Sequence, residues 1–79
     1  MRIQLLVTRE DFSAANIERE FRELGVGYQV DYLEDHPDLI ARYNIRHSPA
    51  ILIDGELAFR HPPSDREMRD YFHQLKLRH

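Results

Sequence analysis

A two-residue turn in the second half of the chain restricts the possible folds more than any other local pattern. Asp54-Gly55 lies between two apolar runs, AILI at residues 50–53 and ELAF at residues 56–59. Asp-Gly between such runs is among the strongest short-range signals for a β-hairpin, so two antiparallel strands are predicted here. Pro49 precedes the first run, and because proline has no N–H for a sheet ladder, it marks the start of that strand.

Two further segments have strand patterns. Residues 2–7, RIQLLV, carry apolar side chains on both faces, which is typical of an interior strand, and residues 26–33, VGYQVDYL, alternate as a second strand. With a helix between them, these strands require a right-handed parallel crossover, and the hairpin must add antiparallel strands to the same sheet. The pattern places Ile3, Leu5 and Val7 opposite Leu6, and Tyr28, Val30 and Tyr32 opposite Gln29 and Asp31.

Three segments have helical spacing. The first follows Thr8 and ends at Gly25, where a left-handed cap is usual. The second begins near Asp35-His36-Pro37 and stops at Asn44. The third begins at Ser64, forms a capping box with Glu67, and runs to about Leu77. The predicted inward residues are Ala14, Ile17, Phe21 and Leu24, then Ile40 and Tyr43, then Met68, Tyr71, Phe72 and Leu75.

Length and composition limit the class of protein. Seventy-nine residues, 42% apolar and 32% charged, predict one domain over residues 1–79 with a thin core. Small folds often gain stability from disulfides, metals or a partner subunit. Without cysteine the disulfide route is closed, while dimerisation stays possible.

Charge and hydropathy exclude two kinds of partner. The net charge of −3, from 14 acids against 11 bases with no basic cluster, argues against nucleic-acid binding. No apolar run is long enough to cross a bilayer, so no membrane partner is expected. Met1-Arg2 leads directly into a strand pattern instead of a signal-peptide core, which predicts a cytoplasmic protein.

Two stretches resemble a known family. YNIRHSPAILIDGE, residues 43–56, resembles the tyrosine-glycine-valine-x-x-threonine-proline stretch and IDG hairpin of small bacterial and archaeal thioredoxins, and HPPSDREMRDYF, residues 61–72, resembles their last connection and helix. The whole chain is similar to the thioredoxin-like fold in its glutaredoxin-sized form. The resemblance implies a βαβαββα order, a four-stranded mixed sheet with helices on both faces, and a cis peptide bond before Pro49.

The reactive part of that family is missing. In the family, a Cys-x-x-Cys lies at the N-terminus of the first helix, where helix N–H groups stabilise a thiolate. Here the loop reads TREDFSAAN, residues 8–16, and the two cysteine positions fall on Glu10 and Ser13 or on Asp11 and Ala14, around Phe12. Without a thiolate and a resolving sulfur, this chain alone cannot catalyse disulfide exchange. Glu10 or Asp11 is expected to accept the helix N–H groups instead.

A bound thiol offers another route to sulfur chemistry. Some glutathione transferases place a serine or tyrosine near this loop to hold the thiolate of glutathione, and Ser13 occupies such a position. Glutaredoxins also bind glutathione with a Gly-Gly before a Ser/Thr-Asp pair. This chain keeps Ser64-Asp65, but Pro62-Pro63 replaces the glycines and removes two N–H donors. A plain helix cap at Ser64 is therefore favoured, glutathione is disfavoured, and no cofactor is expected.

The histidines do not predict a metal site. His36, His47, His61, His73 and His79 lack metal-ligand spacing, and no cysteine is present to complete a zinc site. His47 is of separate interest, because it lies two residues before Pro49 and so near the expected groove. Its titration could make the charge of that groove depend on pH near neutrality.

Three functions are compatible with these residues. The first is a redox-inactive module that binds a protein or extended peptide, since the family pairs the backbone before the cis-proline with a substrate chain, which needs no cysteine. The second is an enzyme that uses bound glutathione or a partner's thiol, with Ser13 orienting sulfur. The third is a structural subunit or homodimer. The groove of the first hypothesis comprises His47, Ser48, Pro49, Ser64 and Asp65, with Phe12, Ile45 and Pro62-Pro63 framing an apolar patch.

Overall fold

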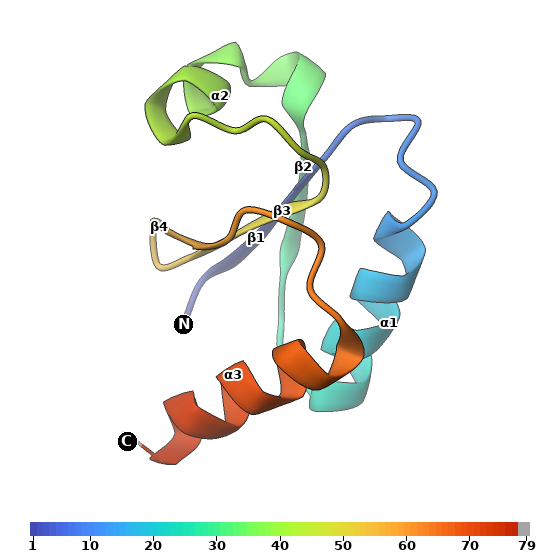
Figure 1. The fold of residues 1–79 in the computed structure, drawn as a ribbon, viewed down its shortest axis with the longest axis vertical. Coiled ribbons are helices and arrows are strands. Elements are labelled where there is room, and N and C mark those ends of the chain that lie inside the picture. The colour runs from blue at the N-terminus through green and yellow to red at the C-terminus, as the bar shows by residue number, and fades with distance from the viewer. Residues whose placement is uncertain (78–79) are drawn as a thin grey trace.

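The predicted strands form one mixed sheet with the order β2-β1-β3-β4. The computed structural model describes residues 1–77 and has an α/β architecture, with the sheet between α2 on one side and α1 and α3 on the other (Figure 1). The elements are β1 Ile3–Val7, α1 Ala14–Leu24, β2 Gln29–Tyr32, a 3-10 turn η1 Leu33–Asp35, α2 Pro37–Tyr43, β3 Ala50–Ile53, β4 Glu56–Phe59 and α3 Asp65–Leu77.

The strand pairing follows the expected topology. β1 pairs in parallel with β2 and antiparallel with β3, which in turn pairs antiparallel with β4. The turn between β3 and β4 places Asp54 at φ 52° and Gly55 at φ 81°, the left-handed conformations that a tight hairpin needs. The hairpin prediction is therefore confirmed.

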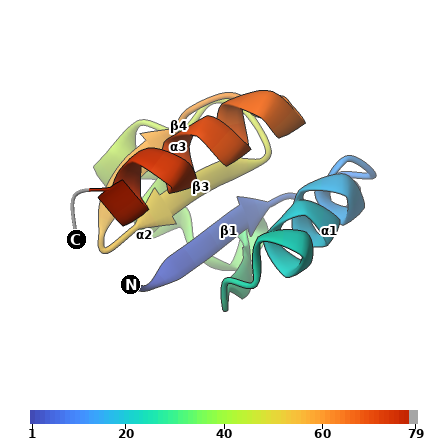
Figure 2. The same ribbon diagram turned by 90° about the horizontal axis from the view of Figure 1, so that it is seen from below.

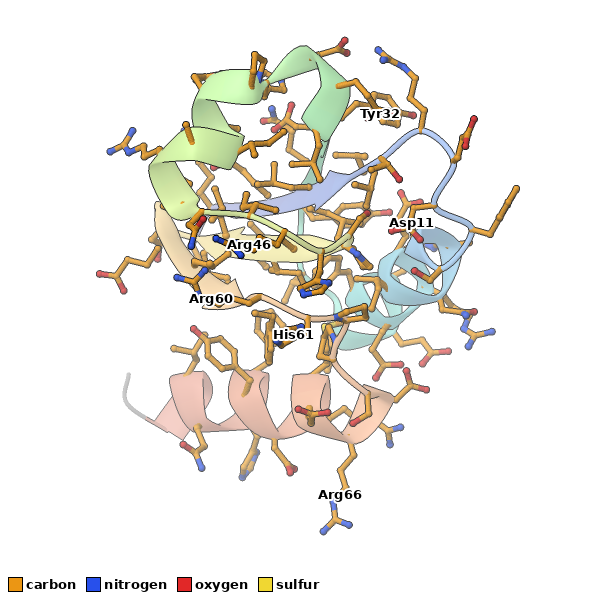
Figure 3. The ribbon with its side chains drawn as sticks, turned by 45° about the horizontal axis from the view of Figure 1, so that its top comes forward. Asp11, Tyr32, Arg46, Arg60, His61 and Arg66 are labelled. Carbon is orange, nitrogen blue, oxygen red and sulfur yellow. The ribbon has the colours of Figure 1, made fainter. Side chains whose placement is uncertain are left out.

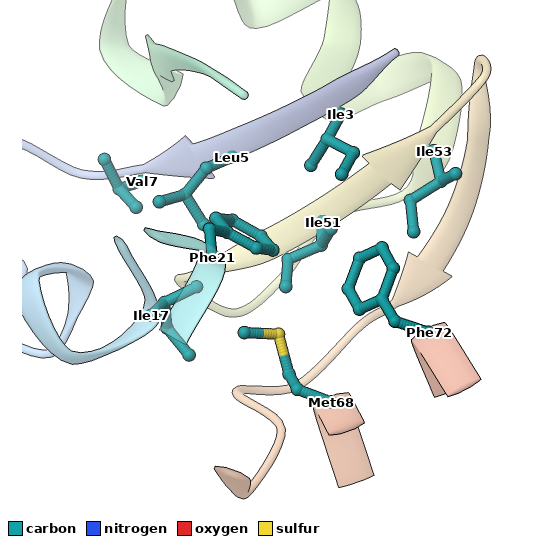
Figure 4. Packing of buried hydrophobic residues seen from close by; sticks show 9 residues of the cluster. All are labelled: Ile3, Leu5, Val7, Ile17, Phe21, Ile51, Ile53, Met68 and Phe72. Atoms are coloured by element: carbon teal, nitrogen blue, oxygen red, sulfur yellow. The ribbon is translucent and has the colours of Figure 1, made fainter. Parts of the chain in front are cut away.

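Two apolar clusters lie on opposite faces of the sheet. We call the first the two-helix face, because α1 and α3 cover it, and the second the single-helix face, because α2 covers it. Viewed from below, α1 and α3 lie in front of the strands with α2 behind them (Figure 2). The buried residues of the two-helix face are Ile3, Leu5, Val7, Ile17, Phe21, Ile51, Ile53, Met68 and Phe72 (Figure 4). Those of the single-helix face are Leu6, Leu33, Ile45, Ala50 and Leu52.

Helix ends agree with two of the predicted caps. The N–H of Ser64 donates to Glu67 Oε1 and the N–H of Glu67 donates to Ser64 Oγ, both over 3.1 Å, which completes the predicted capping box. Gly25 ends α1 with φ 70° and donates its N–H to the carbonyl of Arg22, as expected for a left-handed cap.

The second strand is shorter than predicted. β2 covers Gln29–Tyr32 instead of residues 26–33, and Leu33 begins the 3-10 turn. β2 is an edge strand that pairs only with β1, so it ends where their register ends, at the pair Val7 and Tyr32. The ring of Tyr28, just before β2, still packs on Phe21 with 5.0 Å between ring centroids.

The prediction for the second helix is wrong at one residue. Ile40 was expected to point inward, but it is 36% exposed, and α2 contains no fully buried residue. Leu39 and Tyr43 contact the single-helix face instead. These two residues are four apart and share one side of the helix, so their contact turns Ile40 toward solvent.

Candidate binding site

Ser48 replaces a sheet hydrogen bond with a side-chain one. In an antiparallel ladder, every second pair of opposed residues is hydrogen-bonded. The N–H of Asp54 donates to the carbonyl of Arg2 (2.8 Å), so in the β1–β3 ladder the pair Leu6 and Ala50 belongs to the same series. The next pair in that series would join the N–H of Thr8 to the carbonyl of Ser48. The N–H of Thr8 instead donates to Ser48 Oγ over 3.0 Å. The Ser48–Pro49 peptide bond is cis. The backbone carbonyl of Ser48 therefore lies outside the ladder.

Asp11 joins the loop after β1 to this turn. Its Oδ2 accepts a hydrogen bond from the hydroxyl of Ser48. Its Oδ1 accepts from the N–H of Ser13 (2.9 Å) and from Ser13 Oγ (2.5 Å). One carboxylate thus holds two segments that are 37 residues apart in the sequence. We call this arrangement of Asp11, Ser13, Ser48 and Thr8 the Asp11 clamp.

The clamp favours the charged form of its carboxylate. Partial burial of Asp11 acts to raise its pKa, but hydrogen bonds from the side chains of Ser13 and Ser48, and then from the Ser13 N–H, outweigh that effect and leave the pKa below its ordinary value. Asp11 is therefore an anion at neutral pH, and its two oxygens are both in use as acceptors.

The expected role of the acids as caps of the first helix is wrong. α1 begins at Ala14 and has no acidic residue in its first turn. Asp11 accepts the N–H of Ser13, which is the residue before the helix, and Glu10 is exposed and accepts no hydrogen bond within the described residues. The carboxylate of Asp11 is drawn to Ser48 and so does not reach the helical N–H groups. Of the two alignments, only the one with Asp11 and Ala14 places a loop carboxylate against Ser48.

The expected apolar patch is only partly at the surface. Phe12, at the tip of the loop, is 93% exposed, so it does not turn into the core. Ile45, Pro49 and Pro63 are buried, while Pro62 is exposed. Ala14 packs against the two-helix face. The apolar side chains open to a partner at this end are therefore those of Phe12 and Pro62.

Ser64 and Asp65 are not drawn into the clamp. The hydroxyl and the N–H of Ser64 both belong to the capping box with Glu67. Asp65 is the exposed first residue of α3. Among the described residues, no hydrogen bond joins either side chain to Ser48 or Asp11. These contacts agree with a plain helix cap at Ser64.

A pocket lies beside the Ser48–Pro49 turn, where two Arg-His pairs meet. Arg46-His47 precedes β3 and Arg60-His61 follows β4, so antiparallel pairing of the two strands brings the pairs together. The rings of His47 and His61 lie with their centroids 4.8 Å apart. Figure 3 shows Arg46, Arg60 and His61 on neighbouring segments. This convergence is not among the sequence-based predictions, although an Arg-His pair on each side of a predicted hairpin indicates it.

The other histidines form no ligand cluster. Nε2 of His36 lies 3.7 Å from an Asp31 oxygen, and His73 is exposed. His79 lies outside the described residues. Within residues 1–77, no group of three histidine or acidic side chains is arranged to hold a metal ion, and no helix has the length and apolarity needed to cross a bilayer.

Comparison with known proteins gives no further guide to function. The chain matches no protein-family model, and it matches no curated protein sequence.

Proposed function

We propose that this chain is a redox-inactive member of the thioredoxin-like fold that binds an extended segment of another protein at the Ser48–Pro49 turn. The observation that carries the proposal is the position of the Ser48 carbonyl, which lies outside the β1–β3 ladder because Thr8 donates to the serine hydroxyl. A backbone acceptor next to a sheet end can pair with an added strand, a mode of recognition that needs no reactive side chain.

The surroundings of the turn support a holding function. The Asp11 clamp fixes the loop beside Ser48, so a partner would meet an ordered surface. Phe12, almost fully exposed at the tip of this loop, supplies an aromatic side chain without a folding role, and such residues are favoured in binding interfaces. Phe12 and the Ser48 carbonyl would then contact side chains and backbone of the same segment.

The thiol-enzyme alternative finds less support. The hydroxyl of Ser13 donates to Asp11 Oδ1 over 2.5 Å, so it is already engaged and would have to leave the clamp to orient a sulfur. The chain also contains no cysteine of its own. Purified protein should therefore give no turnover in a disulfide-reduction assay with any supply of reductant, and measurable turnover would contradict the argument from missing thiolates.

The binding proposal can be tested with peptides selected from a random library against the immobilised protein. Selected peptides should shift the amide resonances of residues 11–13 and 47–48 in NMR spectra. Phe12→Ala should weaken their binding about tenfold, as expected for loss of an aromatic contact worth more than about 1 kcal/mol. Ile40→Ala, a matched exposed apolar residue on α2, should leave it unchanged. Peptides that map elsewhere, or that bind both variants alike, would contradict the proposal.

A second candidate function is assembly, because one observation favours it. An open groove of about 790 Å³ is lined by residues of α3, the end of α1 and the end of β3, and its apolar lining includes Leu24, Val26, Ile53 and Phe72. An exposed apolar groove of this kind suits a subunit contact. Light scattering at increasing concentration tests this idea: a dimer that Leu24→Lys converts to monomer supports it, and a monomer at all concentrations rules out self-assembly.

A further inference from the structure

We propose that the pocket between the two Arg-His pairs binds a phosphate group. The pocket has a volume of about 160 Å³. Its polar rim consists of Arg46, His47, Arg60 and His61 with Asn44, and its floor consists of Ile45, Ala50 and Leu57. This site is distinct from the peptide surface proposed above, and its test does not depend on that proposal.

The size of the pocket restricts what it can hold. Sites for drug-sized ligands begin at roughly 300 Å³, about twice the volume found here. A single compact polar group fits such a space, with the remainder of any larger ligand left outside. Because the floor is apolar and closed by buried Ile45 and Ala50, the charged rim side chains supply the recognition.

The charge of the rim selects an anion. Two arginines line the pocket and no aspartate or glutamate does. Within the described residues, neither Arg46 nor Arg60 forms an ion pair, so no carboxylate of the chain neutralises the rim. Two unneutralised guanidinium groups at one small pocket match the two charges of a phosphate dianion, whose geometry suits their paired N–H donors.

One of the arginines is held in place by the fold. Arg60 Nη1 donates to the carbonyls of Tyr43 (3.2 Å) and Asn44 (3.4 Å) at the C-terminal end of α2. These bonds occupy one nitrogen of the guanidinium and leave donors on the others. Arg46 is more loosely placed, with its Nε 3.5 Å from Asn44 Oδ1. The pocket therefore presents one fixed cation and one that can close on a ligand.

The two histidines complete the donor set. Their rings come from two different loops and contact each other at the pocket, with an angle of 45° between the ring planes. Each imidazole can offer an N–H donor in its neutral form and two when protonated. An anion between the rings and the guanidinium groups would accept hydrogen bonds from both loops at once. Phosphate, with more acceptor oxygens and more charge than a monovalent anion such as formate, would use more of these donors.

The test is an NMR titration of ¹⁵N-labelled protein at constant ionic strength with inorganic phosphate, O-phosphoserine and formate. Saturable shifts confined to residues 44–47 and 60–61 are expected with the two phosphate compounds, at concentrations at least tenfold lower than with formate. Tighter binding of inorganic phosphate identifies the free ion as the ligand, and tighter binding of O-phosphoserine identifies a phosphate monoester. No saturable shift, or equal binding of formate, would overturn the proposal.

Variants separate the site from general charge effects. Arg46→Gln should weaken phosphate binding about tenfold, the effect of losing roughly 1.4 kcal/mol from a charged hydrogen bond. Arg66→Gln removes the same charge from α3, far from the pocket in Figure 3, and should leave binding unchanged. Because Arg60 also caps α2, Arg60→Lys is preferred there, and it should weaken binding while the protein stays folded. Equal weakening by Arg46→Gln and Arg66→Gln would reduce the effect to net charge and reject the site.

Discussion

The two faces of the sheet are covered by very different amounts of helix. The two-helix face buries nine apolar residues, four of which belong to α1 and α3. The single-helix face buries five, and α2 contributes none of them. Because apolar burial is the main favourable term in folding, most of the stability should come from the first face. The pocket with its Arg-His rim lies over Ile45 and Ala50 of the second face. Because α2 covers only part of the single-helix face, the loops before β3 and after β4 can carry the polar side chains of the pocket there.

Removing the largest side chain of the two-helix face should have the largest effect. Phe21 is fully buried against Phe72 and Tyr28, so Phe21→Ala should lower the free energy of unfolding by about 3–5 kcal/mol. The same substitution at exposed Phe12 should change it by less than about 0.5 kcal/mol. Urea unfolding followed by circular dichroism measures both. A loss below about 2 kcal/mol at Phe21 would refute the unequal division of stability.

An ion pair between a buried carboxylate and a largely exposed arginine links the two helices of the two-helix face. Glu20 on α1 is 3% exposed and accepts a hydrogen bond from Arg69 Nε on α3 over 3.1 Å. Arg69→Gln should cost about 2 kcal/mol, because it leaves a buried carboxylate without its cation. Adding Glu20→Gln should recover part of the loss, whereas Arg66→Gln, in an exposed pair with Asp70, should cost less than about 0.5 kcal/mol. Equal costs for both arginines would show that the burial of Glu20 adds nothing to its pairing with Arg69.

The Asp11 clamp lies at the end of the sheet, and its contribution should depend on pH. The folded pKa of Asp11 lies below its ordinary value of 3.8, so the charged form is stabilised by folding. That stabilisation is complete above the ordinary value and is lost as the pH falls through the lower folded pKa. Asp11→Asn should therefore cost about 1–2 kcal/mol at pH 7 and progressively less below pH 4.

Glu10→Gln is the matched control for the clamp, since Glu10 accepts no hydrogen bond within residues 1–77. Unfolding free energies of the wild type and both variants should be measured between pH 2 and pH 7. A difference between wild type and Asp11→Asn that stays constant over this range would mean that the clamp does not depend on the carboxylate charge.

The smallest effects are expected on α2. Leu39 packs on the single-helix face and Ile40, its neighbour, faces solvent. Leu39→Ala should cost about 1 kcal/mol, because the side chain is only partly buried, and Ile40→Ala less than about 0.5 kcal/mol. Thermal unfolding resolves the two, and the reverse order would mean that α2 is rotated about its axis relative to the present structure.

The sequence predicted the parts of the fold where several signals agree. The alternation of Leu5 and Leu6, the Asp54-Gly55 turn and the Ser64–Glu67 capping box each combine a side-chain pattern with a backbone requirement, and the structure contains all three. The length of an alternating pattern was less informative about the length of the strand. The segment 26–33 has the alternation of a strand throughout, but only the part that meets β1 is paired.

The errors at α2 and in the site have a common cause. A helix of seven residues has only about two turns, so the spacing of its apolar residues does not show whether Leu39 or Ile40 faces the core. Likewise, a carboxylate before a helix can turn either to the helix N–H groups or to another loop, and the partner that Asp11 uses is 37 residues away. The contact of Asp11 with Ser48 depends on how two distant loops meet and cannot be derived from local patterns, whereas that of His47 with His61 follows from the predicted hairpin once its two flanks are compared.

The Asp11 clamp contains no group that reacts when the surroundings change from reducing to oxidising. A thiol at this position would form a disulfide or gain oxygen atoms, and so change its charge and size, as its surroundings become more oxidising. The carboxylate of Asp11 and the hydroxyls of Ser13 and Ser48 undergo none of these changes, and the chain has no cysteine that could form a mixed disulfide nearby. The loop after β1 is therefore held in the same way in reducing and oxidising conditions, so a surface built on it would stay available in both.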